Sequence, residues 1–309
     1  MKRSLIATWG HRGLSNNSTE STYEIGKIII NTVLGRAICA HAVMKVGFAV
    51  VLAISFAAST MTAPAVPAAA AASETSGASF STPTAFPVPT GHLPVAKQPL
   101  RVLAGTTVDF HNKDIAGTTS GRSEYQQPVV IVEPGATVKN LIIAAPAADG
   151  VHCLASCTLD HVWWPQVGED AATLQDGSPA NAVMKVIGGG ARHAYDKVFQ
   201  IDGAGTAIVR DFSAEDIGAL VLSCGQCIHQ YPRHLAVFNS LISGGHYHVG
   251  GINQNDGDTA DFANITIIGK PIHVCQESIG HTDRPAEYLP YTSPDSYCRY
   301  NPATIAYRP

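Results

Sequence analysis

The chain has 309 residues, of which 45% are hydrophobic and 14% charged, and its formal net charge at pH 7 is −4. This composition is typical of one large or two small globular domains with a sizeable core, and it argues against a largely disordered chain. The negative charge and the lack of a run of lysine and arginine argue against a nucleic-acid-binding protein.

The first recognisable feature along the chain is a targeting signal. Met44 and Lys45 precede the apolar run VGFAVVLAISFAAS, which has the length of a signal-peptide core and is followed by small residues suited to cleavage. A membrane-spanning helix would need about 20 apolar residues. We therefore expect an upstream segment over 1–43, translation that begins at Met44, and a signal peptide over 44–72. The mature protein is expected to be secreted, without membrane contact.

The segment after the apolar run consists mostly of Ala, Pro, Ser and Thr. Such a composition cannot bury a core and is typical of a flexible spacer. We expect a linker over 73–85 and one folded domain over 86–309.

Six cysteines follow the linker: Cys153, Cys157, Cys224, Cys227, Cys275 and Cys298. An even number in an exported chain predicts disulfides. The simplest pairing joins each cysteine to its neighbour in this order, although other pairings remain open. A structural zinc site formed by the two close pairs is a further alternative.

The middle of the chain repeats a short β-branched run, a polar turn residue and a second apolar run. Six positions are expected to be equivalent in successive repeats: Asn140, His161, Val186, Asp211, Asn239 and Asn264. No long stretch has helical periodicity. The pattern predicts an all-β fold, a right-handed parallel β-helix in which each coil stacks on the next, with a β-sandwich as the alternative. The glycines of 188–190 are expected at a sharp corner.

Several motifs occur together between Phe86 and Cys298: PVVIVEPGATVKNLII, ADGVHC, SCTLDHVWW, VGEDAATL, GGGARHAYDKVFQ, SCGQC and GINQNDGDTA. In this order they resemble the third polysaccharide-lyase family, the small secreted parallel β-helix pectate lyases. The resemblance implies a monomeric, Ca²⁺-dependent enzyme that cleaves polygalacturonate of the plant cell wall by β-elimination and releases unsaturated oligogalacturonides.

The resemblance also implies a set of site residues. Four acids would bind the metal: Asp149, Glu169, Asp170 and Asp196. Carboxylate oxygens are the hard ligands that Ca²⁺ prefers, although acids in turns are more often simply solvated. Lys197 is expected to be a catalytic or substrate-binding cation, and Glu124 matches another acidic position near the cleft. Because neighbouring strand residues face opposite sides, Asp196 and Lys197 can share a cleft only if a turn or bulge lies there.

One segment departs from the family pattern. Where the family has a lysine and, three residues later, an arginine, this chain has Ala219 and Leu222. Either catalysis depends on Lys197 with help from other cations, or the protein binds pectic polymer without cleaving it efficiently. The candidate helpers are Arg192, Arg210 and Arg233. A strand-flanking arginine such as Arg233 is often structural.

Other side chains have simpler interpretations. Trp163 and Trp164 are expected in the core rather than in a sugar-stacking platform. His246 and His248 are expected on a polar surface strand rather than in a zinc site. A polygalacturonase-type hydrolase would share the fold and the substrate, but it would need aspartates placed as an acid and a water-activating base.

Overall fold

The structure is a computed structural model that describes residues 85–121 and 126–309. The expected upstream segment, signal peptide and linker lie outside these residues, except for Ala85, and so does Glu124. The described residues form β-strands and two short 3-10 helices, η1 (Gln254–Asp256) and η2 (Pro302–Thr304). None of the helices among them is long and apolar enough to cross a membrane.

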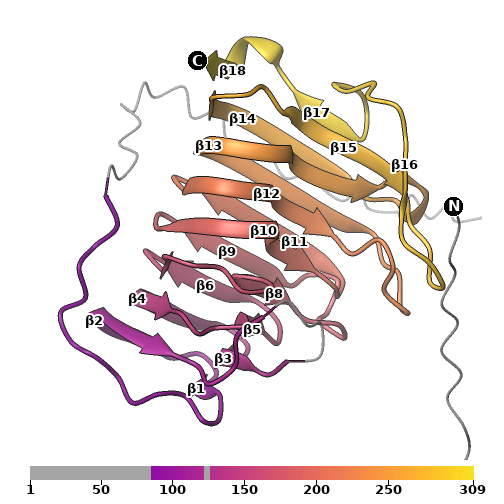
Figure 1. The fold of residues 1–309 in the computed structure, drawn as a ribbon. Coiled ribbons are helices and arrows are strands. Elements are labelled where there is room, and N and C mark those ends of the chain that lie inside the picture. Colours follow the sequence, from indigo (N-terminus) through magenta and orange to yellow (C-terminus); the bar gives the residue numbers. More distant parts are fainter. Residues whose placement is uncertain (1–84, 122–125) are drawn as a thin grey trace, which may run out of the picture. The chain divides into compact units, whose positions relative to one another are not determined.

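The strands stack as coils, and each coil contributes to three parallel sheets (Figure 1). The first sheet contains β1 (Leu100–Val102), β3 (Pro128–Val132), β5 (Asp149–Cys153), β8 (Ala172–Leu174), the ends of β10 (Gly190–Ile201), β12 (Ser213–Ser223) and β13 (Arg233–Asn253), and β15 (His273–Ile279). The second contains the first parts of β2 (Thr107–Ala116), β4 (Ala136–Ala144), β13 and β14 (Thr259–Ile268), with β6 (Cys157–Asp160), β9 (Val183–Ile187), β11 (Gly205–Arg210) and β17 (Cys298–Tyr300).

The third sheet contains β7 (Trp163–Trp164), β18 (Ile305–Arg308), the last parts of β2, β4 and β14, the first parts of β10 and β12, and the middle of β13. The short strand β16 (Glu287–Tyr288) pairs antiparallel with β15. The expected parallel β-helix is therefore confirmed, and the β-sandwich alternative is wrong.

Apolar side chains from all three sheets point inward and form one continuous core. The expectation for the two tryptophans is confirmed, because both are buried. The Trp164 ring contacts those of Phe199 and Phe212 at centroid distances of 5.8 and 6.4 Å. Trp163 packs edge-on against Phe86 at 5.1 Å. These large rings fill the space between the sheets and stabilise the middle coils.

One corner of every coil from β4 onward is turned by a residue with positive φ. The column of corner residues is Asn140, His161, Gly188, Asp211, Asn239 and Asn264. Five of the six expected positions are therefore confirmed, but Val186 is wrong, because it lies in β9 and Gly188 turns the corner two residues later. Glycine reaches positive φ without steric cost, whereas a β-branched residue does not.

Side-chain hydrogen bonds link the corner residues along the stack. The Nδ2 group of Asn239 donates to Asp211 Oδ1 at 3.3 Å, and that of Asn264 donates to Asn239 Oδ1 at 3.0 Å. Asn140 donates in the same way to Asp109 at 2.9 Å. Each corner amide is therefore satisfied by its neighbouring coil, which ties the local turn to the stacking of the coils.

Three disulfides join neighbouring cysteines: Cys153–Cys157, Cys224–Cys227 and Cys275–Cys298. The simplest pairing expected from the sequence is confirmed. Because the sulfurs of both close pairs are used in these bonds, the zinc alternative is wrong.

We predict that Asn239→Val destabilises the fold through this corner. Valine is strained at a φ of 46° and cannot replace either hydrogen bond, so the free energy of unfolding should fall by about 2–4 kcal/mol. Asn239→Gly removes the same hydrogen bonds but adopts this φ freely, so its loss should be smaller. Urea unfolding measures both values, and equal losses would contradict a role for the backbone conformation.

Candidate functional site

Two columns of side chains run across the coils of the first sheet. In one column Lys197 is in register with Ala219, Ala219 with His248, and His248 with His273. The second column lies three residues further along each strand and contains Gln200, Leu222, Gly251 and Gln276. Adjacent coils are about 4.8 Å apart. Residues more than twenty positions apart in sequence therefore become direct neighbours.

The same register brings the predicted acids to Lys197. Phe199 in β10 pairs with Ala172 in β8, which pairs with Val151 in β5. Two residues earlier on each strand, Lys197, Asp170 and Asp149 are therefore aligned. The hydrogen bond from the Gly150 amide to the carbonyl oxygen of Asp170, 2.9 Å long, agrees with this alignment. The stacking of coils thus gathers acids from separate motifs, as the sequence predicted.

A bulge in β10 allows Asp196 and Lys197 to reach the same pocket. The register between β10 and β12 shifts between Ala194 and Lys197, and both Asp196 and Lys197 line the pocket. Gly218 lies against this bulge, where a Cβ atom would be 2.0 Å from the carbonyl oxygen of Asp196. The bulge expected from the sequence is confirmed, and a glycine opposite it provides the necessary space.

Lys197 lies at the centre of the cluster, and its side chain is only 4% exposed. Its Nζ is 3.0 Å from Glu169 Oε1, 3.3 Å from Asp170 Oδ1 and 3.1 Å from Asp196 Oδ2. Glu169 and Asp170 are also buried, whereas Asp196 is more than half exposed. The ammonium is thus enclosed by two buried carboxylates on one side and meets solvent-facing Asp196 on the other.

Asp149 is the fourth acid of the cluster. One oxygen, Oδ2, is 2.7 Å from His152 Nε2. The other, Oδ1, is buried and has no hydrogen-bond partner among the described residues. A buried carboxylate oxygen without a partner is costly, so this atom marks a place where a positively charged ligand would be stabilised.

The charges in the cluster shift one another's pKa. Burial raises the pKa of Asp170 well above its ordinary value, Lys197 opposes this shift, and the neighbouring Glu169 and Asp149 add to it. Burial lowers the pKa of Lys197, but Asp170, Glu169 and Asp196 more than offset that effect and raise it. The Lys197 amine is therefore a charged ammonium and not a free base at neutral pH.

The cluster fits a calcium ion. Asp149, Glu169, Asp170 and Asp196 supply the hard oxygen donors that Ca²⁺ prefers. Three carboxylates contact the Lys197 ammonium. The fourth acid, Asp149, is paired with His152, and its buried Oδ1 has no hydrogen-bond partner among the described residues. A divalent cation would supply the missing charge, and these four residues are the ones that would hold it.

The three candidate arginines lie outside this cluster of contacts. The Nε of Arg192 is 2.8 Å from Glu215 Oε2, and its guanidinium stacks on the Phe86 ring at 4.0 Å. Arg210 lies at the end of β11 beside Asp211. Arg233 is buried, and its guanidinium donates to the carbonyl oxygens of Gly203, Asp202, Cys224 and His229, to Ser223 and to Gln230. Arg233 therefore holds backbone segments together.

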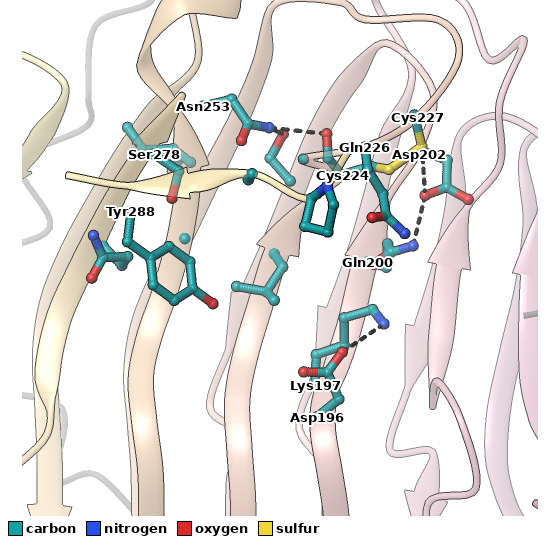
Figure 2. Close-up of a pocket in the computed structure, with 18 of the residues that line it drawn as sticks. Asp196, Lys197, Gln200, Asp202, Cys224, Gln226, Cys227, Asn253, Ser278 and Tyr288 are labelled. Atoms are coloured by element: carbon teal, nitrogen blue, oxygen red, sulfur yellow. Dashed lines mark hydrogen bonds and ion pairs between the residues drawn. A yellow bond between two sulfur atoms is a disulfide. The ribbon is translucent and has the colours of Figure 1, made fainter. Parts of the chain in front are cut away.

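The cluster opens into a pocket of about 520 Å³. Figure 2 shows Lys197 and Gln200 on one side of it and Tyr288 and Ser278 on the other. His248 also lines this pocket and is buried, so the expectation that it lies on a surface strand is wrong. The neighbouring Tyr288, from β16, packs edge-on against it at 6.3 Å. No local pattern in the sequence indicates this burial, because Tyr288 lies 40 residues further along the chain.

Comparisons with known proteins agree with this geometry. A family profile described as "Pectate lyase" matches residues 83–284. The chain belongs to the pectate lyase family. Pectate lyase H of Emericella nidulans is 36% identical over 227 residues, which cover 69% of this chain and 86% of that protein. Pectate lyase E of the same organism is 36% identical over 220 residues, covering 70% and 85%.

Solved structures of this family share the fold. The catalytic domain of pectate lyase PelI from Erwinia chrysanthemi is 28% identical, with a TM-score of 0.58, and the match covers 71% of this chain and 98% of that one. PelI in complex with tetragalacturonic acid is 29% identical, with a TM-score of 0.57, and the match covers 66% and 68%.

We predict that Lys197→Gln destabilises the metal-free protein by about 3 kcal/mol, because the buried carboxylates lose their counter-charge. Burial raises the pKa of the Asp170 carboxyl, and the variant lacks the Lys197 charge that opposes this shift. The folded state therefore holds a proton that the unfolded state releases, and stability should fall as the pH rises above about 4, the ordinary pKa of an aspartate.

Urea unfolding in the presence of a chelator measures this effect, with exposed Lys185→Gln as the matched control. Added calcium should stabilise both variants, because both keep the four acids, and should stabilise Lys197→Gln more, because the ion replaces the lost positive charge. An equal, pH-independent loss in both variants would contradict the electrostatic role of Lys197.

Proposed function

We propose that this member of the pectate lyase family is a secreted, Ca²⁺-dependent pectate lyase that cleaves polygalacturonate by β-elimination. The observation that carries the proposal is the convergence of three carboxylates on Lys197 at the edge of a pocket, with Asp149 in register on the next coil. The three disulfides support export into an oxidising compartment. The related PelI was solved with tetragalacturonic acid, which supports an acidic galacturonan as the substrate.

The reaction removes the C5 proton next to a substrate carboxylate and expels the oxygen at C4. A bound calcium ion would neutralise that carboxylate and make the C5 proton more acidic. In this proposal Asp149, Glu169, Asp170 and Asp196 hold the ion. Lys197, which faces both the acids and the pocket, orients the uronate and is the candidate proton acceptor.

Lys197 can accept a proton only after it has lost its own. Because its pKa is raised by the surrounding carboxylates, the neutral amine is rare at neutral pH and becomes more abundant in alkaline solution. We therefore propose a weak enzyme whose rate rises with pH. Arg192, paired with Glu215 and stacked on Phe86, lies outside the acid cluster, and Arg233 supports the backbone beside the pocket.

The experiment is incubation of the purified protein with polygalacturonate, with and without calcium. A lyase produces an unsaturated sugar that absorbs ultraviolet light, and we expect product only with calcium and more of it at alkaline pH. New reducing ends without absorbance would instead identify a hydrolase. Absence of both would contradict the proposed activity.

A second candidate function is binding of pectic polymer with little cleavage. It is favoured by Ala219, the neighbour of Lys197 in the register, and by Leu222, which lines the pocket. Neither side chain carries a positive charge that could bind a carboxylate or lower the pKa of Lys197. Saturable binding of polygalacturonate without product would favour this function.

We predict that the double variant Ala219→Lys and Leu222→Arg cleaves polygalacturonate at least about tenfold faster than the natural chain, because cations stabilise the charge that develops in the transition state. Ala219 is fully buried, so circular dichroism must show that the variant is folded. The control is Lys185→Arg on β9, which leaves the pocket unchanged. A folded double variant with an unchanged rate would contradict the assigned register.

A further inference from the structure

Beyond Lys197, one column of side chains in the pocket is uncharged. Across successive coils, this column contains Gln200, Leu222, Gly251 and Gln276. The two glutamines carry amides, the leucine carries an alkyl group, and the glycine has no side chain. All four residues line the pocket. No lysine or arginine other than Lys197 lines it among the described residues.

The ionisable groups at this pocket do not favour a second anion. Lys197 is already paired with three carboxylates. His248 has a pKa lowered by burial to about 4, so it is uncharged at neutral pH. Tyr288, whose pKa is raised by burial, is also uncharged at neutral pH, and the remaining ionisable lining residues are the acids Asp176, Asp196 and Asp202. An ionised uronate placed here would lose hydration without gaining a counter-charge, which is unfavourable.

The shape of the pocket adds an apolar surface. A Cβ atom on Gly251 would lie 2.7 Å from Leu222 Cδ2 and 2.9 Å from His248 Nε2. Glycine at this position therefore leaves the Leu222 side chain uncovered toward the pocket, where it is partly exposed. The same pocket is lined by polar side chains that need no ionic partner, among them Asn253, Ser278 and Tyr288 (Figure 2).

We propose that this pocket, defined by Gln200, Leu222, Gly251 and Gln276, accepts a methyl-esterified galacturonosyl unit, while an ionised unit lies at the acid cluster. The inference rests on the proposed function of that cluster. A methyl ester has no charge. Its carbonyl can accept a hydrogen bond from the Gln200 amide, which donates one of its two N–H groups to Asp202, and its methyl group can pack on Leu222. A neutral hexose is also uncharged but has no apolar group at C6 to cover Leu222. The preferred substrate is therefore a partly esterified galacturonan.

The test compares kcat/KM on polygalacturonate and on partly methyl-esterified pectin, both with calcium, for the wild type, Leu222→Arg and Leu222→Met. The wild type should prefer the esterified polymer. Leu222→Arg adds a cation to the pocket. It should lower the ratio of kcat/KM on the esterified polymer to kcat/KM on polygalacturonate by about tenfold or more. Leu222→Met keeps an apolar side chain of similar volume and should leave the ratio unchanged.

A wild type that prefers polygalacturonate, with a ratio that Leu222→Arg does not alter, would overturn the inference. If neither polymer yields unsaturated product, the proposed activity is wrong. The inference about the pocket is then tested separately, by calorimetric measurement of the affinities for esterified and ionised oligogalacturonides. The inference is supported if the wild type binds the esterified oligomer more tightly than the ionised one, and if Leu222→Arg weakens binding of the esterified oligomer more than binding of the ionised one. Equal or weaker binding of the esterified oligomer, or tighter binding of a neutral galactan fragment, contradicts it.

Discussion

The coil-to-coil register of the first sheet is the constraint on which the rest of the structure depends. It aligns Asp149, Asp170 and Lys197 on three successive coils and then continues through Ala219 and His248. A slip of one residue on any of these strands would send the aligned side chain to the opposite face. The aromatic core at Trp164 and the hydrogen-bonded corner residues fix this register. The fold and the site are thus consequences of the same stacking.

The site combines two unlike regions side by side. At the acid cluster, buried carboxylates carry more negative charge than one lysine neutralises, which favours binding of a metal ion. Further along the stack, Leu222 lines the pocket together with the uncharged polar side chains of Gln276, Asn253 and Ser278. Ala219 and Leu222, three residues apart on β12, carry the two columns from Lys197 and Gln200 into the next coil.

Much of this arrangement was predictable from the sequence. The repeated β-branched runs indicated stacked coils, the acids of successive motifs were expected together, and a bulge at Asp196 and Lys197 was required for them to share a cleft. The prediction of a corner at Val186 was wrong because the run VMKVIGG has no polar turn residue. Gly188, which tolerates positive φ, was the residue that indicated the corner. The burial of His248 was not predictable, because it depends on β16, whose position is set by tertiary contacts.

The most direct measurement of the central claim is a calorimetric calcium titration of the wild type and of Asp149→Asn. This substitution changes the acid that carries the unpartnered buried oxygen. We expect saturable calcium binding to the wild type, a weaker affinity in Asp149→Asn, and no change in the exposed control Asp283→Asn. A wild type that binds no calcium, or whose affinity is the same in all three proteins, would contradict the proposal that the stacked coils build a metal site.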